Sequence, residues 1–205
     1  NTEVNSGTSG TGSIGLFRLR HATIKMDWTK TSLTLGQTWY PTFVPEVFPG
    51  VANFNTGIMF NPFGWASQIR LRQKLSEKIS LDIVAYKDRE FTAPSVAGNA
   101  PNSATFNSSI PTFHGQLQFK NQQVIAGLGA EYQSLKPVTE SGGKVSDEKL
   151  NSSTVFGYFK YTNSKVVAKL YGISGGNLNH LVMLGGYASY AETNGINSYK
   201  PTKTT

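Results

Sequence analysis

The sequence predicts an all-β fold, an antiparallel β-barrel built from meander hairpins, on three observations. Apolar and polar residues alternate along about nine segments of roughly 8 to 12 residues, and such alternation is typical of strands with one apolar and one polar face. Short and long connections between these segments take turns along the chain. All nine prolines fall in the predicted loops, as expected for a residue that cannot donate to a sheet.

The composition favours a membrane barrel over a cytosolic enzyme. Of the 205 residues, 38% are hydrophobic and 15% are charged, yet the formal net charge is +7. A barrel wall needs only every second residue to be apolar. No apolar run approaches the roughly 18 residues of a transmembrane helix. The chain has no cysteine, which excludes a disulfide scaffold and a thiolate metal site.

The clearest hairpin is predicted at residues 67–88. Arg70, Arg72 and Lys74 alternate with apolar residues on its first strand, and Leu81 and Ile83 share one face of its second. The turn lies at residues 76–78. We expect the basic side chains to face water inside a barrel, and the apolar side chains to face lipid or a neighbouring subunit.

The other strands are predicted at residues 15–28, 33–40, 112–120, 124–133, 154–161, 166–174 and 181–191. The alternation in the first of these shifts phase near His21, which predicts either a β-bulge or a strand that contacts protein on both faces. The alternating short and long connections are typical of outer-membrane barrels, in which single chains carry an even number of strands. Nine strands would leave open edges in lipid. The sequence therefore predicts that residues 1–205 form one partial β-barrel domain of a larger barrel.

Two motifs near the start of the chain carry a family resemblance. Residues 17–22 read FRLRHA and residues 35–39 read LGQTW. Over roughly residues 15–90, the chain resembles the DcaP-like trimeric porins of Gram-negative bacteria and their relatives in the Bacteroidota. The resemblance implies a homotrimer of barrels with about sixteen strands each, in the bacterial outer membrane. It also implies a basic lumen for small anionic solutes. The chain is about half as long as such a porin, which supports the partial-barrel prediction.

The first group of candidate site residues is basic. Rings of arginine and lysine favour anions through their summed field and their hydrogen bonds to carboxylate or phosphate. The alternative is a solvated sheet face, or counter-charges for carboxylates such as Asp82 and Asp88. By this argument, and for the first two residues by the family resemblance, the predicted pore-lining residues are Arg18, Arg20, Arg70, Arg72 and Lys74.

The second group lies in a proline-rich and aromatic-rich loop predicted at residues 41–66. This loop is expected to narrow a pore as a constriction, to contact a neighbouring subunit, or to form a packed external cap. Its candidate residues are Phe43, Glu46, Phe48, Phe54 and Trp65. A third group lies near strand ends, where tryptophan and tyrosine suit a membrane interface. The alternative is ordinary aromatic packing in a core. These aromatic residues are Trp28, Trp39, Tyr86 and Tyr132.

These patterns predict a porin, a water-filled outer-membrane channel for passive diffusion of small anionic solutes. Outer-membrane lipid and lipopolysaccharide are its expected surroundings. Two alternatives stay open: a barrel that anchors or scaffolds a larger membrane complex, and a soluble all-β ligand-binding module. The three histidines have no ligand spacing, so a zinc site is not expected. No catalytic motif with supporting context is present, and the basic residues do not cluster as in nucleic-acid-binding proteins. We expect no enzyme activity and no cofactor.

Overall fold

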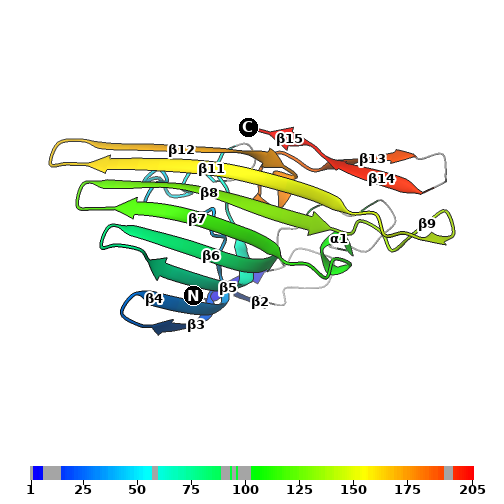
Figure 1. The fold of residues 1–205 in the computed structure, drawn as a ribbon, viewed down its shortest axis with the longest axis horizontal. Coiled ribbons are helices and arrows are strands. Elements are labelled where there is room, and N and C mark those ends of the chain that lie inside the picture. Colours follow the sequence, from blue (N-terminus) through cyan, green and yellow to red (C-terminus); the bar gives the residue numbers. More distant parts are fainter. Residues whose placement is uncertain are drawn as a thin grey trace.

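The computed structural model describes residues 2–6, 15–56, 60–88, 93, 96, 103–191 and 196–205. Within these residues the protein is all-β, with one short helix, α1 (Ser103–Phe106), and one 3-10 helix, η1 (Leu178–Leu181). Figure 1 shows a large antiparallel sheet that forms the body of the molecule. The predicted all-β fold is therefore confirmed.

Nine strands make up this sheet, and strands that follow one another in the chain are mostly paired. The order across the sheet is β15-β12-β11-β8-β7-β6-β5-β4-β3. The pairs are antiparallel, as expected for a meander of hairpins. The bounds are β3 Ala22–Asp27, β4 Thr31–Trp39, β5 Trp65–Lys74, β6 Ile79–Asp88, β7 Thr112–Lys120, β8 Val124–Leu135, β11 Leu150–Thr162, β12 Val167–Gly176 and β15 Lys203–Thr204.

Three two-stranded ribbons complete the described strands. Each is a separate antiparallel pair beside the large sheet. They are formed by β1 (Thr2–Ser6) with β2 (Gly15–Leu19), β9 (Glu140–Ser141) with β10 (Lys144–Val145), and β13 (Tyr187–Ala191) with β14 (Asn197–Pro201).

Short turns join β3 to β4, β5 to β6, β7 to β8 and β11 to β12 at one end of the sheet (Figure 1). We call this end the short-turn end. In three turns a side-chain oxygen, of Ser76, Asn121 or Asn163, accepts hydrogen bonds from the backbone N–H groups two and three residues later. The donor–acceptor distances are 2.7 to 3.2 Å. Such local bonds are the reason that serine and asparagine favour turns.

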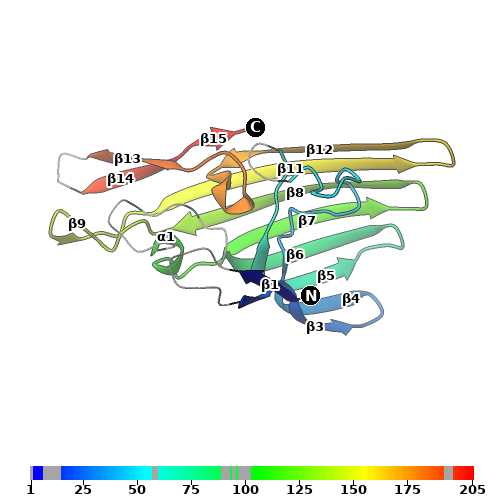
Figure 2. The ribbon, with the colours of Figure 1, turned by 180° about the vertical axis from the view of Figure 1, so that it is seen from behind.

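The sheet has one covered face and one open face. The chain between β4 and β5 (the 40–64 connection) crosses one face of the sheet in its described residues 40–56 and 60–64, as Figure 2 shows from behind. Two side chains of β12 hold this connection: Lys169 Nζ donates to the Phe48 carbonyl at 2.6 Å, and Tyr171 OH donates to the Thr42 carbonyl at 3.0 Å. We call the face under the connection the covered face and the opposite face the open face.

The open face is apolar and exposed. Strand alternation places large hydrophobic side chains there on eight neighbouring strands, with exposed fractions of 74% for Leu128, 71% for Leu170 and 58% for Ile69. A typical soluble protein does not expose so wide an apolar surface without a partner. The residues are Ile24, Met26, Leu33, Leu35, Ile69, Leu71, Ile83, Phe113, Leu117, Leu128, Val155, Phe159 and Leu170.

The main hydrophobic core lies on the covered face. It joins sheet residues to apolar residues of the 40–64 connection and of the segment around η1. The backbone N–H of Phe63 also donates to the Leu181 carbonyl at 2.9 Å, which links these two segments. The core residues are Tyr40, Val44, Val47, Ala66, Val84, Tyr86, Ile125, Phe156, Tyr158, Ile173, Leu178, Leu181 and Met183.

Two glycines of β8 leave room for aromatic rings on the covered face. The ring of Tyr158 lies over Gly127, so that its hydroxyl oxygen accepts hydrogen bonds from Gln116 Nε2 at 2.5 Å and Gln118 Nε2 at 2.9 Å. The ring of Phe156 lies over Gly129 in the same way. These glycines therefore mark positions where a ring lies directly over the backbone of β8.

Gly127→Val is expected to lower the free energy of unfolding by about 1 to 3 kcal/mol, the usual effect of overpacking. A Cβ at position 127 would overlap ring atoms of Tyr158 and push the ring off its glutamine donors. Denaturant titration of the folded protein, followed by tryptophan fluorescence, measures the change. Gly115→Val is the matched control, because a Cβ there meets no atom within 4 Å; equal effects of both variants would contradict the prediction.

The structure corrects the strand predicted at residues 15–28. A β-bulge at His21 is wrong, because β2 ends at Leu19, β3 begins at Ala22, and only β3 belongs to the large sheet. Side chains of β4 replace the backbone ladder at the break. Gln37 Nε2 donates to the Leu19 carbonyl at 2.5 Å, and His21 Nδ1 bonds to Thr38 Oγ1 at 3.0 Å.

The strand predicted at residues 181–191 is also wrong. Only Tyr187–Ala191 is a strand, and it pairs with β14 outside the large sheet, whose ninth member is the short β15. Two left-handed residues, Asn177 and Val182, and two glycines with positive φ, Gly185 (155°) and Gly186 (114°), turn the chain here. The apolar residues that suggested a strand instead cover the core through η1.

Candidate functional site

The basic residues of the 67–88 hairpin lie on the covered face. Register places Arg72 opposite Asp82 and Arg70 opposite the buried Val84. The Arg70 guanidinium donates to Gln68 Oε1 at 3.1 Å and to the Trp39 carbonyl at 3.3 Å. Lys74, at the end of β5, is exposed. The hairpin therefore carries these three residues on one face, opposite the apolar residues with which they alternate.

Arg72 and Asp82 form a bidentate ion pair with two N–O distances of 2.6 Å. The Asp82 side chain is 6% exposed and that of Arg72 is 40% exposed. The Asp82 carboxylate is thus almost fully excluded from solvent, whereas the Arg72 guanidinium is partly exposed to solvent. The counter-charge role left open from the sequence applies to this arginine.

Arg72→Gln is expected to lower the free energy of unfolding by about 2 to 3 kcal/mol, because it removes charged hydrogen bonds and leaves a buried carboxylate unpaired. The double variant Arg72→Gln/Asp82→Asn should recover most of this loss, since it leaves no buried charge. Denaturant titration measures both. A double variant as unstable as the single one would contradict the prediction.

The other two predicted basic residues are not part of the strands of this hairpin. Arg20 lies between β2 and β3, and its guanidinium carbon is 4.7 Å from the ring centroid of Trp65. The side chain of Arg18 lies outside the described residues. The structure therefore does not place Arg20 in one row with Arg70 and Arg72.

Three lysines that sequence reasoning missed stand in one row at the short-turn end of the covered face. Lys160 of β11 is directly opposite Lys169 of β12, and Ile125 of β8 separates Lys160 from Lys120 of β7. Lys160 is half-buried, whereas Lys120 and Lys169 are exposed. Glu46 of the connection approaches Lys120 at 3.8 Å. We call Lys120, Lys160 and Lys169 the lysine row.

Like charges directly opposite each other on a sheet repel. Within the described residues, Glu46 is the single carboxylate at ion-pair distance from the lysine row. The row therefore keeps a net positive charge where the covered face meets solvent. Alternation could have placed each lysine on a polar face, but the row itself depends on strand register.

The loop predicted at residues 41–66 lies against the covered face, and its aromatic residues pack together. Phe43 is the centre, with ring centroids 4.7 Å from Phe48, 5.9 Å from Phe54 and 5.3 Å from Phe63. The loop ends at Gly64. Trp65 and Ala66, which were predicted to belong to the loop, are the first two residues of β5. Trp65 is therefore a buried strand residue, 2% exposed, and is not part of the loop.

His21 contacts the ends of β4 and β5 next to this loop. Trp65 Nε1 donates to His21 Nε2 at 3.3 Å, and the His21 ring stands edge-on to Trp39 at 4.8 Å. Burial lowers the pKa of His21, and nearby positive charges, including that of Arg20, lower it further. A neutral imidazole fits this geometry, because its Nε2 accepts a hydrogen bond from Trp65 Nε1.

A buried polar network crosses the covered face beside the core. Glu131 Oε1 accepts from Tyr86 OH at 3.1 Å and lies 2.9 Å from His114 Nδ1. Gln133 Nε2 donates to Asp88 Oδ2 at 2.8 Å. Such networks stabilise a single arrangement of a polar interior when their groups are paired.

The predicted interface aromatics are divided between the two faces. Trp28, at the β3–β4 turn, is 58% exposed, and Tyr132, on the open face, is 43% exposed. Trp39 packs edge-on against Phe43 at 5.0 Å. Tyr86 is wrong as an interface residue, because it is 1% exposed and points into the polar network.

Comparisons with protein-family models, curated proteins and solved structures gave no match. The DcaP-like resemblance therefore stays a prediction. In the described part of the chain, no group of three or more histidine, aspartate or glutamate side chains could hold a metal ion. Those same residues contain no helix long and apolar enough to span a membrane.

Proposed function

We propose that the chain forms part of the wall of an outer-membrane channel for small anionic solutes. The observation that carries the proposal is the unequal chemistry of the two sheet faces. The open face exposes leucine, isoleucine, valine and phenylalanine on seven strands and carries half-buried leucines on β4, whereas the covered face carries arginine, lysine, glutamine and carboxylates. A barrel in lipid needs an apolar outside and tolerates a polar inside.

The short-turn end is then the periplasmic rim, and the long connections lie toward the cell exterior. The 40–64 connection folds inward and narrows the channel on the side of the lysine row. The two lateral edges of the sheet are then paired with further strands, because lipid does not tolerate open edges. A homotrimer, lipid and lipopolysaccharide belong to the proposal as the surroundings of the open face.

A plugged barrel that anchors a membrane complex is the second candidate. It is favoured by the apolar core that the 40–64 connection and the η1 segment build on the covered face. A channel on this side of the wall must pass beside that core, along the more exposed Arg72 and lysine row. The two candidates therefore differ in one measurable property, the ion conductance of the folded protein.

Reconstitution of the full-length protein into planar bilayers tests both candidates. A channel gives stable conductance steps, and a reversal potential under a KCl gradient that shows anion preference. A plugged anchor inserts, migrates as a folded barrel in unheated gel samples, and shows no steps. A folded full-length protein that neither inserts nor conducts would overturn both.

A further inference from the structure

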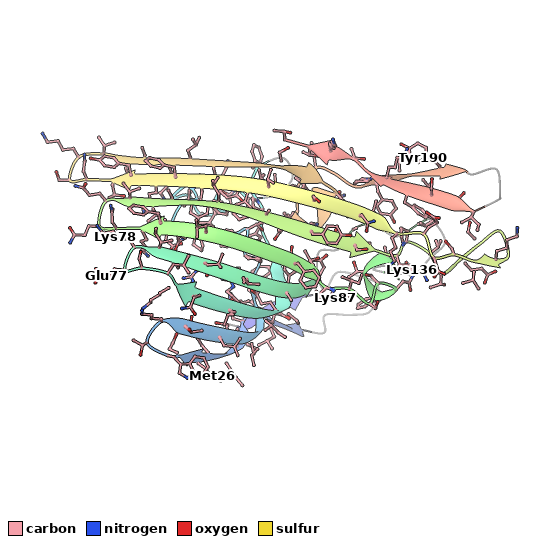
Figure 3. All side chains as sticks on the ribbon, in the orientation of Figure 1. Met26, Glu77, Lys78, Lys87, Lys136 and Tyr190 are labelled. Atoms are coloured by element: carbon pink, nitrogen blue, oxygen red, sulfur yellow. The ribbon has the colours of Figure 1, made fainter. Side chains whose placement is uncertain are left out.

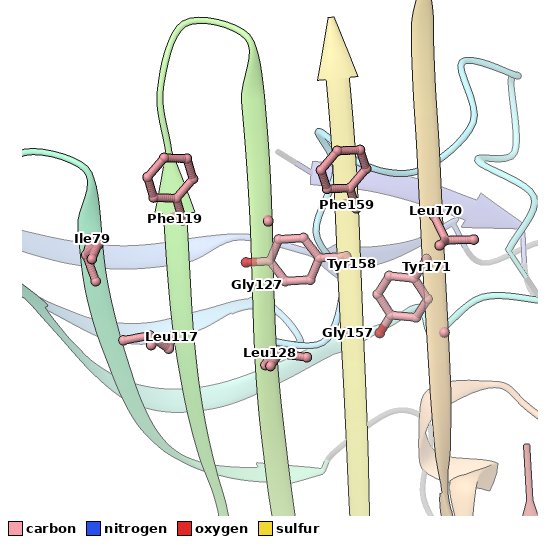
Figure 4. Close-up of a pocket in the computed structure, with 12 residues that line it drawn as sticks. Ile79, Leu117, Phe119, Gly127, Leu128, Gly157, Tyr158, Phe159, Leu170 and Tyr171 are labelled. Atoms are coloured by element: carbon pink, nitrogen blue, oxygen red, sulfur yellow. The ribbon is translucent and has the colours of Figure 1, made fainter.

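The open face has a hollow of about 650 Å³ near the short-turn end. It forms because Gly157 of β11 and Gly172 of β12 present no side chain between the larger residues of neighbouring strands (Figure 4). A Cβ added at Gly172 would meet no atom within 4 Å. The lining is almost entirely apolar, and its larger open-face residues are Ile79, Leu117, Phe119, Leu128, Phe159 and Leu170.

A polar hollow adjoins it at the rim. Its lining comes from the β5–β6 and β7–β8 turns and includes Glu77, Lys78 and the amide side chains of the second turn. Neighbouring residues of the chain line the two hollows, because Lys78 directly precedes Ile79 and Lys120, which also lines the polar hollow, directly follows Phe119. Figure 3 shows Glu77 and Lys78 at the outer tip of their turn.

We propose that these two hollows form one binding site for a glycerophospholipid. The acyl chains lie in the apolar hollow over Gly157 and Gly172, and the phosphate is held at the rim by Lys78 and the amide donors of the β7–β8 turn. This inference rests on the proposed membrane location of the open face. The site lies at the short-turn rim, so its lipid belongs to the leaflet at that side.

The chemistry favours this occupant over a second copy of the chain. A phospholipid is apolar along its chains and anionic at one end, and the site has the same order: an apolar hollow, then a lysine with amide donors. The volume lies within the roughly 300 to 1,000 Å³ of typical ligand pockets. Basic groups beside apolar membrane surfaces are a known way of holding anionic head groups.

Native mass spectrometry of the full-length protein in detergent micelles tests the acyl-chain part, with dioleoyl phosphatidylglycerol as the probe. Gly172→Leu, which fills the hollow, is expected to weaken binding at least tenfold relative to the unmodified protein. Gly115→Leu is the matched control, because Gly115 is also an open-face glycine with free space for a Cβ but lies outside the hollow. Equal affinity of the two variants would overturn the site.

The head-group part has its own comparison. Dioleoylglycerol, which has the same chains without the phosphate, should bind at least tenfold more weakly than the phospholipid. Lys78→Gln should remove most of this difference, whereas Lys144→Gln, in β10 at the other end of the molecule, should leave it unchanged. Equal binding of both probes to the unmodified protein would overturn the role of the rim.

Two further readings separate the possible failures. Migration of unheated samples on a gel shows whether each variant is folded, and unfolded variants are replaced by the smaller change Gly172→Ala. Insertion of the unmodified protein with no bound phospholipid overturns the site but not the proposed function. Failure of the folded protein to insert overturns both. A mass that corresponds to two protein chains with no bound lipid would identify the hollow as a subunit contact if Gly172→Leu converted this species to a single chain. That result would overturn the lipid site.

Discussion

Leu128→Arg is expected to lower the free energy of folding into lipid vesicles by about 2 to 4 kcal/mol, the effect of a basic residue near the middle of a barrel's lipid face. Leu128 lies on the open face of β8 and is 74% exposed. In water, an arginine at so exposed a position changes stability by less than about 0.5 kcal/mol. The same substitution thus separates a membrane barrel from a soluble β-sheet protein. Urea titration of the protein in vesicles measures the effect.

Ile69→Arg, on β5, repeats this test far from the first site. It should also destabilise the protein in vesicles, and the two effects should add, because distant sites are usually independent. Val145→Arg is the control: Val145 is 79% exposed, but it lies in the β9–β10 ribbon outside the large sheet. If all three variants were neutral, the open face would not contact lipid.

The sequence predicts most of the wall of this fold. Strict alternation locates the large-sheet strands β4, β5, β6, β7, β8, β11 and β12, because each apolar face is in contact with one environment along its whole length. The turns of that region follow from serine and asparagine at their first positions. Alternation also places Arg70 and Arg72 on one face. What it does not supply is the identity of each residue's cross-strand neighbour.

The predictions failed where side chains or glycines override alternation. The alternation of residues 15–28 shifts phase near His21, and the structure divides these residues into two strands, with Gln37 and Thr38 hydrogen-bonded to Leu19 and His21 at the break. Residues 181–191 are apolar because they cover the core, and left-handed residues turn them away from the sheet. The lysine row was missed for another reason. Residues 120, 160 and 169 lie on three different strands, and the register of three strand pairs is needed to show that they form one row.

Lys160→Glu is expected to reduce the anion-to-cation permeability ratio of the reconstituted channel about fivefold or more. One unit charge acting on an ion at about 4 Å in water contributes about 1 kcal/mol, which corresponds to about fivefold, and this variant changes the charge by two units. Lys160 is chosen because no hydrogen bond joins its side chain to the described part of the 40–64 connection. The reversal potential at about 0.1 M salt measures the ratio, since higher salt screens the charge.

The comparison variants separate a local field from net charge and from loop movement. Lys144→Glu changes the net charge by the same amount at the other end of the molecule, so it should leave the reversal potential unchanged. Lys169→Glu should lower anion preference too, and it should also increase current noise, because it removes the hydrogen bond from Lys169 Nζ to the Phe48 carbonyl. Lys160→Arg should keep the preference of the unmodified channel. If Lys160→Glu and Lys144→Glu shifted the potential equally, the lysine row would not lie on the path of the ions.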